Sequence, residues 1–159
     1  MPRRWVLSKR ERKQLVKELS SLYPGLELNP SSKIEYYQSR ELPLIIIVGD
    51  VPAFFKYEDK WIPHLKYLLS KGYDWIPRVV VDMGAITPLG RGADVMAPGI
   101  RRIIGEFRAG DPVAVVDEKY GKPFVVGIAL VDSVKIPGMK RGRAVKNIHR
   151  VGDRVWRLL

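Results

Sequence analysis

Cysteine is absent from this 159-residue sequence, and its absence removes several kinds of chemistry at once. Disulfide bonds, zinc–thiolate centres, iron–sulfur clusters and thiol catalysis all need a cysteine sulfur atom. A chain built without disulfides suits a reducing compartment, so we expect a cytoplasmic protein.

Histidine is almost as scarce, with only His64 and His149 in the chain. Neither lies in an H-x-x-H or H-E-x-x-H pattern, and the sequence has no phosphate-binding P-loop and no G-x-S-x-G nucleophile motif. We therefore expect no catalytic residue, no metal and no cofactor. Scattered aspartates are expected to cap turns through nearby backbone groups; these are Asp82, Asp94, Asp111, Asp117 and Asp132.

Long apolar runs are missing as well. The longest is Leu44 to Val48, which is far too short to cross a bilayer. The basic N-terminal stretch MPRRWVLSKRERK has no apolar stretch behind it, so we expect no secretory signal. We expect no membrane partner either, although the charge described next by itself leaves attraction to a membrane surface open.

Positive charge is what the sequence has in excess. Lys and Arg number 28 against 17 Asp and Glu, which gives a formal net charge of +11. Such an imbalance favours a nucleic-acid partner, since a phosphate backbone attracts basic surfaces. A membrane surface or a merely solvated basic surface remain as alternatives from charge alone.

The first half of the chain shows helical and strand patterns in alternation. Ser8 and Glu11 form an S-x-x-E capping box, and the apolar spacing behind it predicts a helix that stops at Pro24-Gly25. Strands are predicted at 33–38, 44–48 and 53–57, a turn at 58–60, and a second helix at 61–70. Residues 1–76 are thus expected to form an α+β domain.

The second half has a different sequence pattern, in which glycines frequently interrupt short apolar runs. Strands are predicted at 79–81, 112–116, 123–131 and 155–158, with a hairpin turn at Gly121. One short helix is predicted around Ala93 to Met96. Residues 77–159 are thus expected to form a small, all-β domain that resembles a closed barrel.

The segment VDMGAITPLGRGADVMAPGI, residues 81–100, is rich in glycine and proline. Its glycines permit close backbone approach, Arg91 lies between two of them, and Arg101 and Arg102 follow directly. Exposed amides, guanidinium groups and the start of the helix expected at Ala93 would together suit a phosphate. From these residues alone, a structural turn and a phosphate site are equally good interpretations.

The same segment resembles a known domain. The pieces are Val81-Asp82, Gly84-Ala85-Ile86, the run from Gly92 to Ile100, then Asn147-Ile148-His149 and Trp156, and they resemble the PUA domain, named for pseudouridine synthase and archaeosine transglycosylase. Upstream, Phe54-Phe55, the run Trp61 to Leu65, and Pro77 follow the layout of one PUA family. This is the malignant-T-cell-amplified-sequence family, also called translation-machinery-associated protein twenty, here of archaeal type.

The resemblance implies a fold and a function. The fold would be an α+β N-terminal domain followed by an all-β PUA pseudo-barrel with a short helix. The function would be binding of a tRNA acceptor end or rRNA on the small ribosomal subunit, in initiation or recycling, with a density-regulated-protein-like partner and no enzymatic activity. The RNA-binding residues implied by the motif or added for their positive charge are Gly90, Arg91, Gly92, Ala93, Met96, Pro98, Gly99, Arg101, Arg102, Arg141, Arg143, Asn147, His149 and Arg150.

Other functions stay open at this point. The chain could serve as an accessory subunit in ribosome biogenesis or RNA modification, and exposed aromatic residues in the first half would favour that role; the candidates are Phe54, Phe55, Tyr57 and Trp61. An RNA-modifying enzyme would need a catalytic motif, which residues 1–78 lack.

The segment Lys140 to Arg143 is more basic than the family leads us to expect, so it either extends the RNA surface or meets a different partner.

Overall fold

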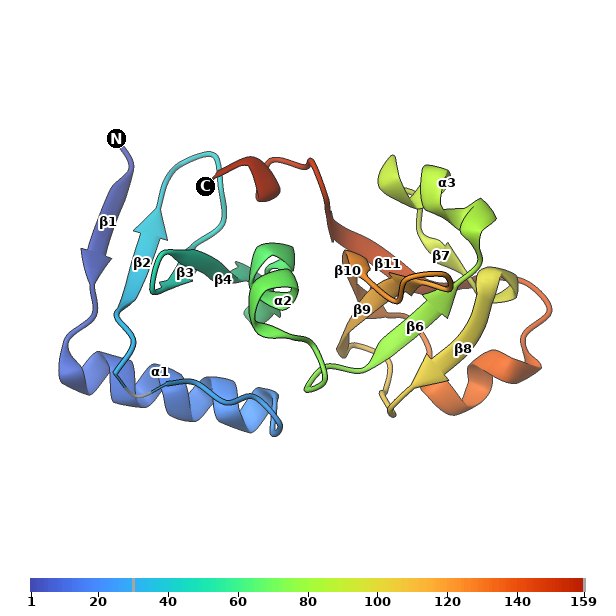
Figure 1. Ribbon diagram of the computed structural model, residues 1–159, viewed down its shortest axis with the longest axis horizontal. Helices are drawn as coiled ribbons and strands as arrows, with labels where there is room; N and C mark the ends of the chain where they lie inside the picture. The colour runs from blue at the N-terminus through green and yellow to red at the C-terminus, as the bar shows by residue number, and fades with distance from the viewer. Residues whose placement is uncertain (30, 159) are drawn as a thin grey trace. The chain divides into compact units, whose positions relative to one another are not determined.

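The computed structural model describes residues 1–29 and 31–158 (Figure 1). The chain divides into two compact units, Met1–Trp75 together with Leu158, and Ile76–Arg157. Each unit has its own cluster of buried apolar side chains. In the described part of the chain, no helix is both long enough and apolar enough to cross a membrane.

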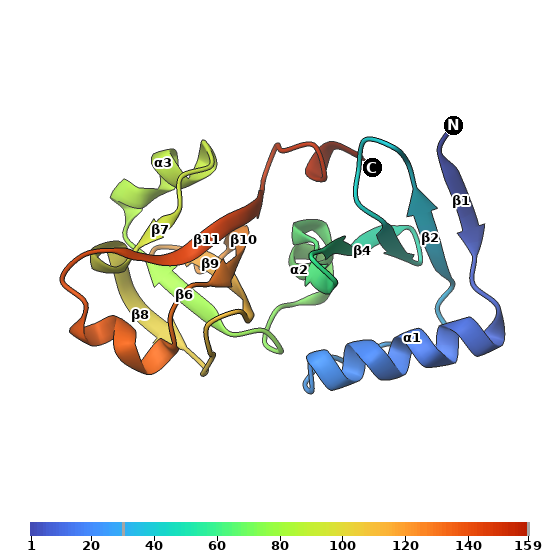
Figure 2. The same ribbon diagram turned by 180° about the vertical axis from the view of Figure 1, so that it is seen from behind.

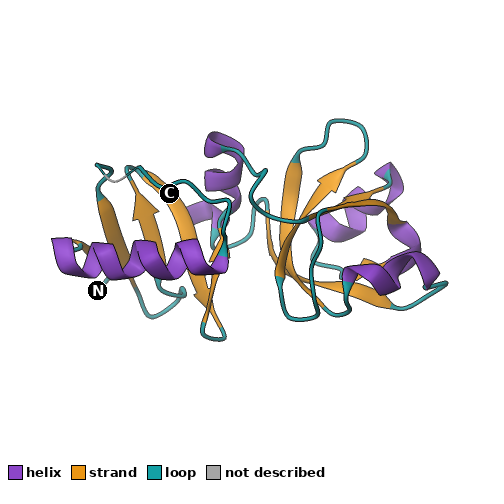
Figure 3. Cartoon of the chain, turned by 90° about the horizontal axis from the view of Figure 1, so that it is seen from below, coloured by secondary structure: helices purple, strands orange, loops and turns teal. Residues whose placement is uncertain are grey.

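The first unit is built on a five-stranded antiparallel sheet with the strands in chain order. Helix α1, Lys9–Leu22, crosses one face of that sheet (Figure 3). Leu15 and Leu19 of the helix belong to one buried apolar cluster with residues of the strands, among them Ile34, Ile46 and Phe54. The strands are β1 (Arg3–Val6), β2 (Ile34–Gln38), β3 (Ile45–Val48), β4 (Val51–Tyr57) and β5 (Lys60–Pro63).

The start of α1 follows the sequence prediction. The Ser8 hydroxyl accepts a hydrogen bond from the Glu11 amide at 3.2 Å, and the Glu11 carboxylate accepts one from the Ser8 amide at 3.0 Å. Leu15 and Leu19 are buried on the inner side of the helix. The capping box and the apolar spacing are therefore confirmed, because both depend only on neighbours within a few residues.

The second predicted helix, at 61–70, is wrong at its start. Glu58 and Asp59 both have positive φ, 45° and 64°, and form a tight hairpin turn. That turn lays Trp61 into strand β5, antiparallel to β4 with Lys56 opposite it. Helix α2 begins only at Leu65 and runs to Lys71, and His64 caps it by accepting a hydrogen bond from the Lys66 amide at 3.0 Å.

The second unit is a six-stranded sheet that curls into a half-barrel, as seen from behind in Figure 2. Strands β6 and β9 are parallel, and the other neighbours are antiparallel. The predicted fold class, an α+β domain followed by an all-β pseudo-barrel with a short helix, is confirmed, except that the sheet is open between β7 and β8 and not closed as expected. In the order β7-β11-β10-β9-β6-β8, the strands are Val95–Met96, Arg143–Arg150, Pro123–Ala129, Pro112–Asp117, Arg78–Val81 and Ile100–Ile104.

Valines from neighbouring strands fill the interior of this half-barrel, with Val79, Val115 and Val125 all inaccessible to solvent. At Gly127 the pairing of β10 with β11 shifts by a residue, and an added Cβ there would lie 2.3 Å from the carbonyl oxygen of Lys146. Only glycine permits that approach. Two 3₁₀ turns, η2 (Ala97–Gly99) and η3 (Ser133–Gly138), connect strands on the outside.

The short helix of the second unit lies earlier than predicted. The Asp82 carboxylate accepts a hydrogen bond from the Ala85 amide at 3.1 Å and starts the 3₁₀ turn η1, Met83–Ala85, which leads into helix α3, Ile86–Gly90. Residues 91–92 form a turn, residues 93–94 have no regular structure, and Val95–Met96 is strand β7. Asp94 does not start a helix, because its carboxylate bonds to strand β11 instead.

The strand predicted at 155–158 is also wrong. The structure has a 3₁₀ helix there, η4, Trp156–Leu158. The Asp153 carboxylate accepts hydrogen bonds from the amides of Arg150 and Trp156, at 2.9 and 2.8 Å, and these bonds turn the chain before a strand can form.

Candidate nucleic-acid interface

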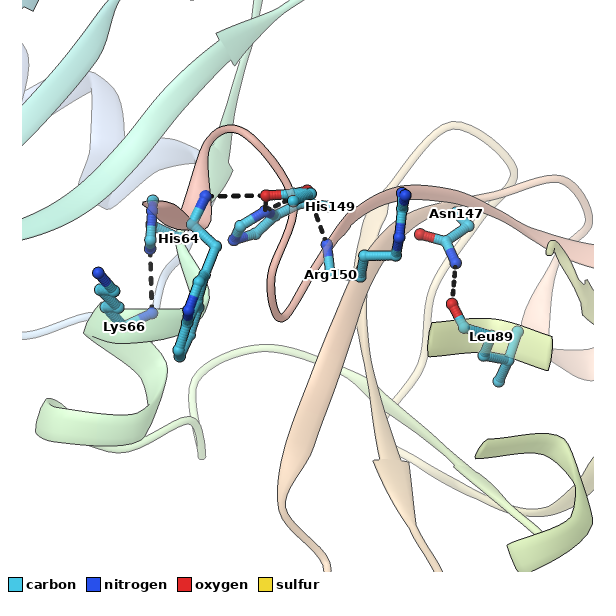
Figure 4. A network of polar contacts seen from close by, with 8 residues as sticks. His64, Lys66, Leu89, Asn147, His149 and Arg150 are labelled. Carbon is cyan, nitrogen blue, oxygen red and sulfur yellow. Dashed lines mark hydrogen bonds and ion pairs between the residues drawn. The ribbon is translucent and has the colours of Figure 1, made fainter. Parts of the chain in front are cut away.

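Asn147 ties the end of helix α3 to strand β11. Its side-chain Nδ2 donates to the carbonyl oxygen of Leu89 at 2.9 Å (Figure 4). The same nitrogen donates to the carbonyl oxygen of Ala93, also at 2.9 Å. Its main-chain amide donates to Oδ1 of Asp94, also at 2.9 Å. Three bonds from a single residue therefore fix the glycine-containing loop against the sheet, and each partner lies more than 50 positions away in the sequence.

Asp94 in turn orients an arginine. Its Oδ2 accepts a hydrogen bond from Nη1 of Arg143 at 3.1 Å, and the Arg143 side chain keeps 62% of its surface exposed. The bond engages one terminal nitrogen of the guanidinium, and most of the side chain stays exposed to solvent. Asp94 thus differs from Asp82 and Asp111, which cap local turns as predicted.

Gly92 and Arg150 lie directly against each other. Gly92 has φ +102°, and a Cβ added there would lie 3.3 Å from Nη1 of Arg150. The bare glycine backbone therefore gives the Arg150 guanidinium room beside the loop. Arg91, the adjacent residue, is exposed, and within residues 1–29 and 31–158 no carboxylate forms an ion pair with it.

The loop amides do not form the phosphate cradle that the sequence suggested. The amide of Arg91 donates to Pro88 O at 3.1 Å, that of Gly92 to Leu89 O at 3.0 Å, and that of Ala93 to Pro88 O at 3.1 Å. All three close the carboxyl end of α3, and no helix begins at Ala93. The cationic side chains, rather than free amides or a helix N-terminus, are therefore the groups that this loop offers to an anion.

Met96, Pro98 and Gly99 extend the loop along the sheet edge. Met96 is exposed and pairs with Arg143 across β7 and β11, while Pro98 is exposed in η2. The Gly99 carbonyl accepts a hydrogen bond from the Asp82 amide at 3.1 Å. Beside them is a pocket of about 220 Å³ with almost wholly apolar walls, lined by Val81, Ala85, Pro88, Leu89, Ala93, Asp94, Val95, Met96 and Gly99.

The remaining arginines fall into two groups. Arg101 is engaged, with Nε 3.5 Å from Glu118 and Nη2 3.9 Å from Asp82. Arg102 and Arg141 are exposed and form no ion pair within the described ranges. Gly90 ends α3 in open space, where an added Cβ would meet nothing within 4 Å.

His149 does not face solvent, which corrects its place in the predicted contact surface. Its ring is fully buried, and Nδ1 lies 2.9 Å from Oδ2 of Asp153. Burial acts to raise the pKa of Asp153, but the hydrogen bond and charge of His149, with the amides of Trp156 and Arg150, hold that pKa below its ordinary value. His149 thus stabilises the turn that carries Arg150.

The structure therefore gathers most of the predicted residues around α3, β7 and β11, with Arg101 and Arg102 on β8 and His149 inside. Sequence reasoning missed Asp94 and Asp153 as organisers of this region. Their partners lie across the sheet or on the turn, and an aspartate looks the same in sequence whichever bond it makes. In the described ranges, no group of three or more metal-ligating side chains occurs.

Comparison with known proteins divides the chain in a similar way. Residues 77–151 match the model of the PUA domain, and residues 3–71 match a domain of unknown function, DUF1947.

An uncharacterized protein of Methanocaldococcus jannaschii is 40% identical over 97% of this chain and 95% of its own length. Translation machinery-associated protein 20 of Saccharomyces cerevisiae is 28% identical over 87% of this chain and 83% of its own. Malignant T-cell-amplified sequence 1-A of Xenopus laevis is 24% identical over 92% of this chain and 86% of its own.

Among solved structures, a PUA-domain protein from Aeropyrum pernix superposes with a TM-score of 0.89 at 33% identity, covering 98% of this chain and 90% of that one. The match extends through both units, so the two are similar along nearly their whole length. The chain therefore belongs to the family of PUA-domain proteins that includes Translation machinery-associated protein 20 and Malignant T-cell-amplified sequence 1.

Proposed function

We propose that this protein is a non-catalytic RNA-binding factor of the translation apparatus. Residues 77–159 would form the PUA RNA-binding domain and bind tRNA or rRNA, and residues 1–76 would form the accompanying N-terminal domain. It would act in the cytoplasm on the small ribosomal subunit, in initiation or recycling, with a density-regulated-protein-like partner. The family match and the translation-related names of its relatives support this proposal.

One observation carries the proposal: at the α3–β11 edge, a hydrogen-bonded frame presents the guanidinium groups of Arg91 and Arg150, which form no ion pair with residues 1–29 and 31–158. Asn147 fixes the loop, Gly92 makes room for Arg150, and Arg91 is exposed beside it. A guanidinium group binds phosphate through two parallel, charge-assisted hydrogen bonds, and the fixed loop backbone sets the point from which the Arg91 side chain extends. The formal net charge of +11 supplies long-range attraction to the same partner.

The expected mode of recognition follows from RNA geometry. An A-form helix hides its base edges in a deep, narrow groove, so shape, 2′-hydroxyl groups and unpaired ends are what a protein can read. The arginines would contact phosphates of the RNA. The apolar pocket beside Met96 would lie next to the unpaired nucleotides at the end of the RNA helix.

A salt titration of tRNA binding tests the proposal. The logarithm of affinity should fall linearly with the logarithm of salt, with a slope of roughly −0.7 to −0.9 for each phosphate contacted. Arg91→Glu should weaken binding strongly. Arg108→Glu makes the same charge change at an exposed arginine on the β8–β9 connection, and it should weaken binding much less.

A flat salt response, or equal losses for the two variants, would contradict the proposal.

The accessory-subunit alternative needs an exposed aromatic surface in the first unit, and no specific observation favours it. Phe54, Phe55 and Trp61 are buried, and Tyr57 is half-buried. Mass analysis of tRNA after incubation with the protein would expose any modifying activity.

A further inference from the structure

The hairpin between β9 and β10 ends in a firmly built turn. The Asp117 carboxylate accepts hydrogen bonds from the amides of Tyr120 and Lys122, and its carbonyl accepts one from Gly121 at 3.0 Å. Gly121 has φ +66°, a conformation that glycine adopts without strain. A buried carboxylate and a left-handed glycine thus hold the tip in one conformation, which fixes where Tyr120 lies.

Tyr120 stands out from every other aromatic residue. Its side chain is 67% exposed, whereas all other aromatic residues of the described ranges are buried or half-buried. Leaving a large ring in water gives up the free energy that burial would supply. A rigid turn that holds a ring outward therefore suggests a contact with a partner.

The surroundings of Tyr120 indicate what kind of partner fits. The ammonium of Lys119 lies over the ring, 5.1 Å from its centroid, and Lys122 is exposed two residues further on. The remaining tip residue, Glu118, is itself in an ion pair with Arg101 at 3.5 Å. The tip thus offers one aromatic ring among cations and no apolar patch around it. A protein interface core is apolar and depleted of charge, whereas a nucleotide needs an aromatic face with cations beside it.

The tip is joined to the surface assigned to RNA above. The Glu118 amide donates to Val81 O at 3.0 Å, so the base of the tip continues the end of β6. Arg101 bridges Glu118 and Asp82, and the Asp82 amide bonds to Gly99 O. An RNA strand lying along Pro98 to Arg101 would therefore reach the hairpin tip without leaving the protein surface.

We propose that Tyr120 is a stacking platform for an unpaired base of the bound RNA. The base would stack on the face of the ring opposite Lys119, and Lys119 and Lys122 would contact the phosphates on either side of it. This inference rests on the RNA-binding function proposed above, and it adds a contact on a different element from α3 and β11.

The test compares two RNA stems that differ only in a short 3′ single-stranded overhang. Tyr120→Ala should weaken binding of the overhang RNA about tenfold, as the loss of one stacked base does, and change binding of the blunt stem by less than about twofold. Tyr120→Phe keeps the ring and should bind both RNAs like the parent protein. Val134→Ala, at an 81% exposed side chain on η3, controls for truncation of a surface side chain.

Salt dependence separates stacking from charge. Tyr120→Ala should leave the salt slope unchanged, while Lys119→Ala and Lys122→Ala should each reduce it by about 0.7, the value for one single-strand phosphate. If Tyr120→Ala binds the overhang RNA like the parent, or weakens both RNAs equally, the platform is refuted. If the parent protein binds neither RNA, the proposed function itself has failed.

Discussion

The amide of Asn147 donates a hydrogen bond to the carboxylate of Asp94 at 2.9 Å, across 53 positions of the sequence. The Asn147 side chain at the same time holds the carbonyls of Leu89 and Ala93. This arrangement makes one asparagine the junction of α3, the loop and β11. The hydrogen bonds of Asn147 therefore position the loop and the strand that carry the arginines of the candidate RNA surface.

Replacing Asn147 should loosen that frame. Asn147→Ala leaves the Leu89 and Ala93 carbonyls without their donor, and each such loss costs about 1–3 kcal/mol of unfolding free energy when the group stays buried. Asn147→Asp should be worse, because a carboxylate would face two carbonyl oxygens. Denaturant unfolding measures both. The frame would be disproved by an Asn147→Asp protein as stable as the parent.

A matched pair of glycine variants tests the close approach at the loop. Gly92→Ala places a Cβ at φ +102° and 3.3 Å from the Arg150 guanidinium, so it should lose about 1 kcal/mol or more and displace Arg150. RNA affinity should fall with it.

Gly90→Ala is the control for that substitution, because its Cβ would meet nothing within 4 Å and alanine favours the helical end of α3. It should be neutral or slightly stabilising. Thermal unfolding and RNA titration of both proteins provide the comparison, and equal behaviour would contradict the proposed contact between Gly92 and Arg150.

Arginines that already have carboxylate partners should matter less to RNA than those without. Arg101 is paired with Glu118 and Asp82, whereas Arg91 forms no ion pair with the described residues. Arg91→Ala should reduce the salt slope of RNA binding by about 0.7–0.9, and Arg101→Ala by clearly less. Salt titrations of the two variants decide, and a larger loss for Arg101→Ala would reverse the expectation.

The Asp153–His149 pair should make stability depend on acid. Because the pKa of Asp153 is lowered below its ordinary value of 3.8, the folded state binds that proton more weakly than the unfolded chain. Its contribution is complete above about pH 4 and is lost as pH falls through the folded pKa.

Asp153→Asn should therefore cost about 1–3 kcal/mol near neutral pH, since hydrogen bonds to a charged acceptor are lost, and little at strongly acidic pH. Denaturant unfolding at both pH values measures the difference. An equal loss at both would show that charge has no part in the turn.

Local patterns were predictable from sequence, and the failures have physical causes. The capping box at Ser8 and Glu11 and the valine-rich strands depend on near neighbours, and both were predicted. The helix expected at 61–70 began too early because a hairpin turn at Glu58-Asp59 drew Trp61 into a strand. The helix expected at Ala93 lies instead at Ile86–Gly90, because Asp82 caps the 3₁₀ turn that leads into it.

Composition and motifs are enough to place this protein among basic, cysteine-free PUA-domain proteins with an arginine-containing, glycine-rich segment. Which of its polar and aromatic groups reach the surface follows from the fold. It committed the loop amides to α3, buried His149 against Asp153, and left Tyr120 exposed on a rigid turn. The bonds that make these choices join residues within five positions of one another, while the bonds of Asn147 to Leu89 and Ala93 span more than 50 positions. In both cases the sequence does not show which of several possible partners an amide or a carboxylate takes.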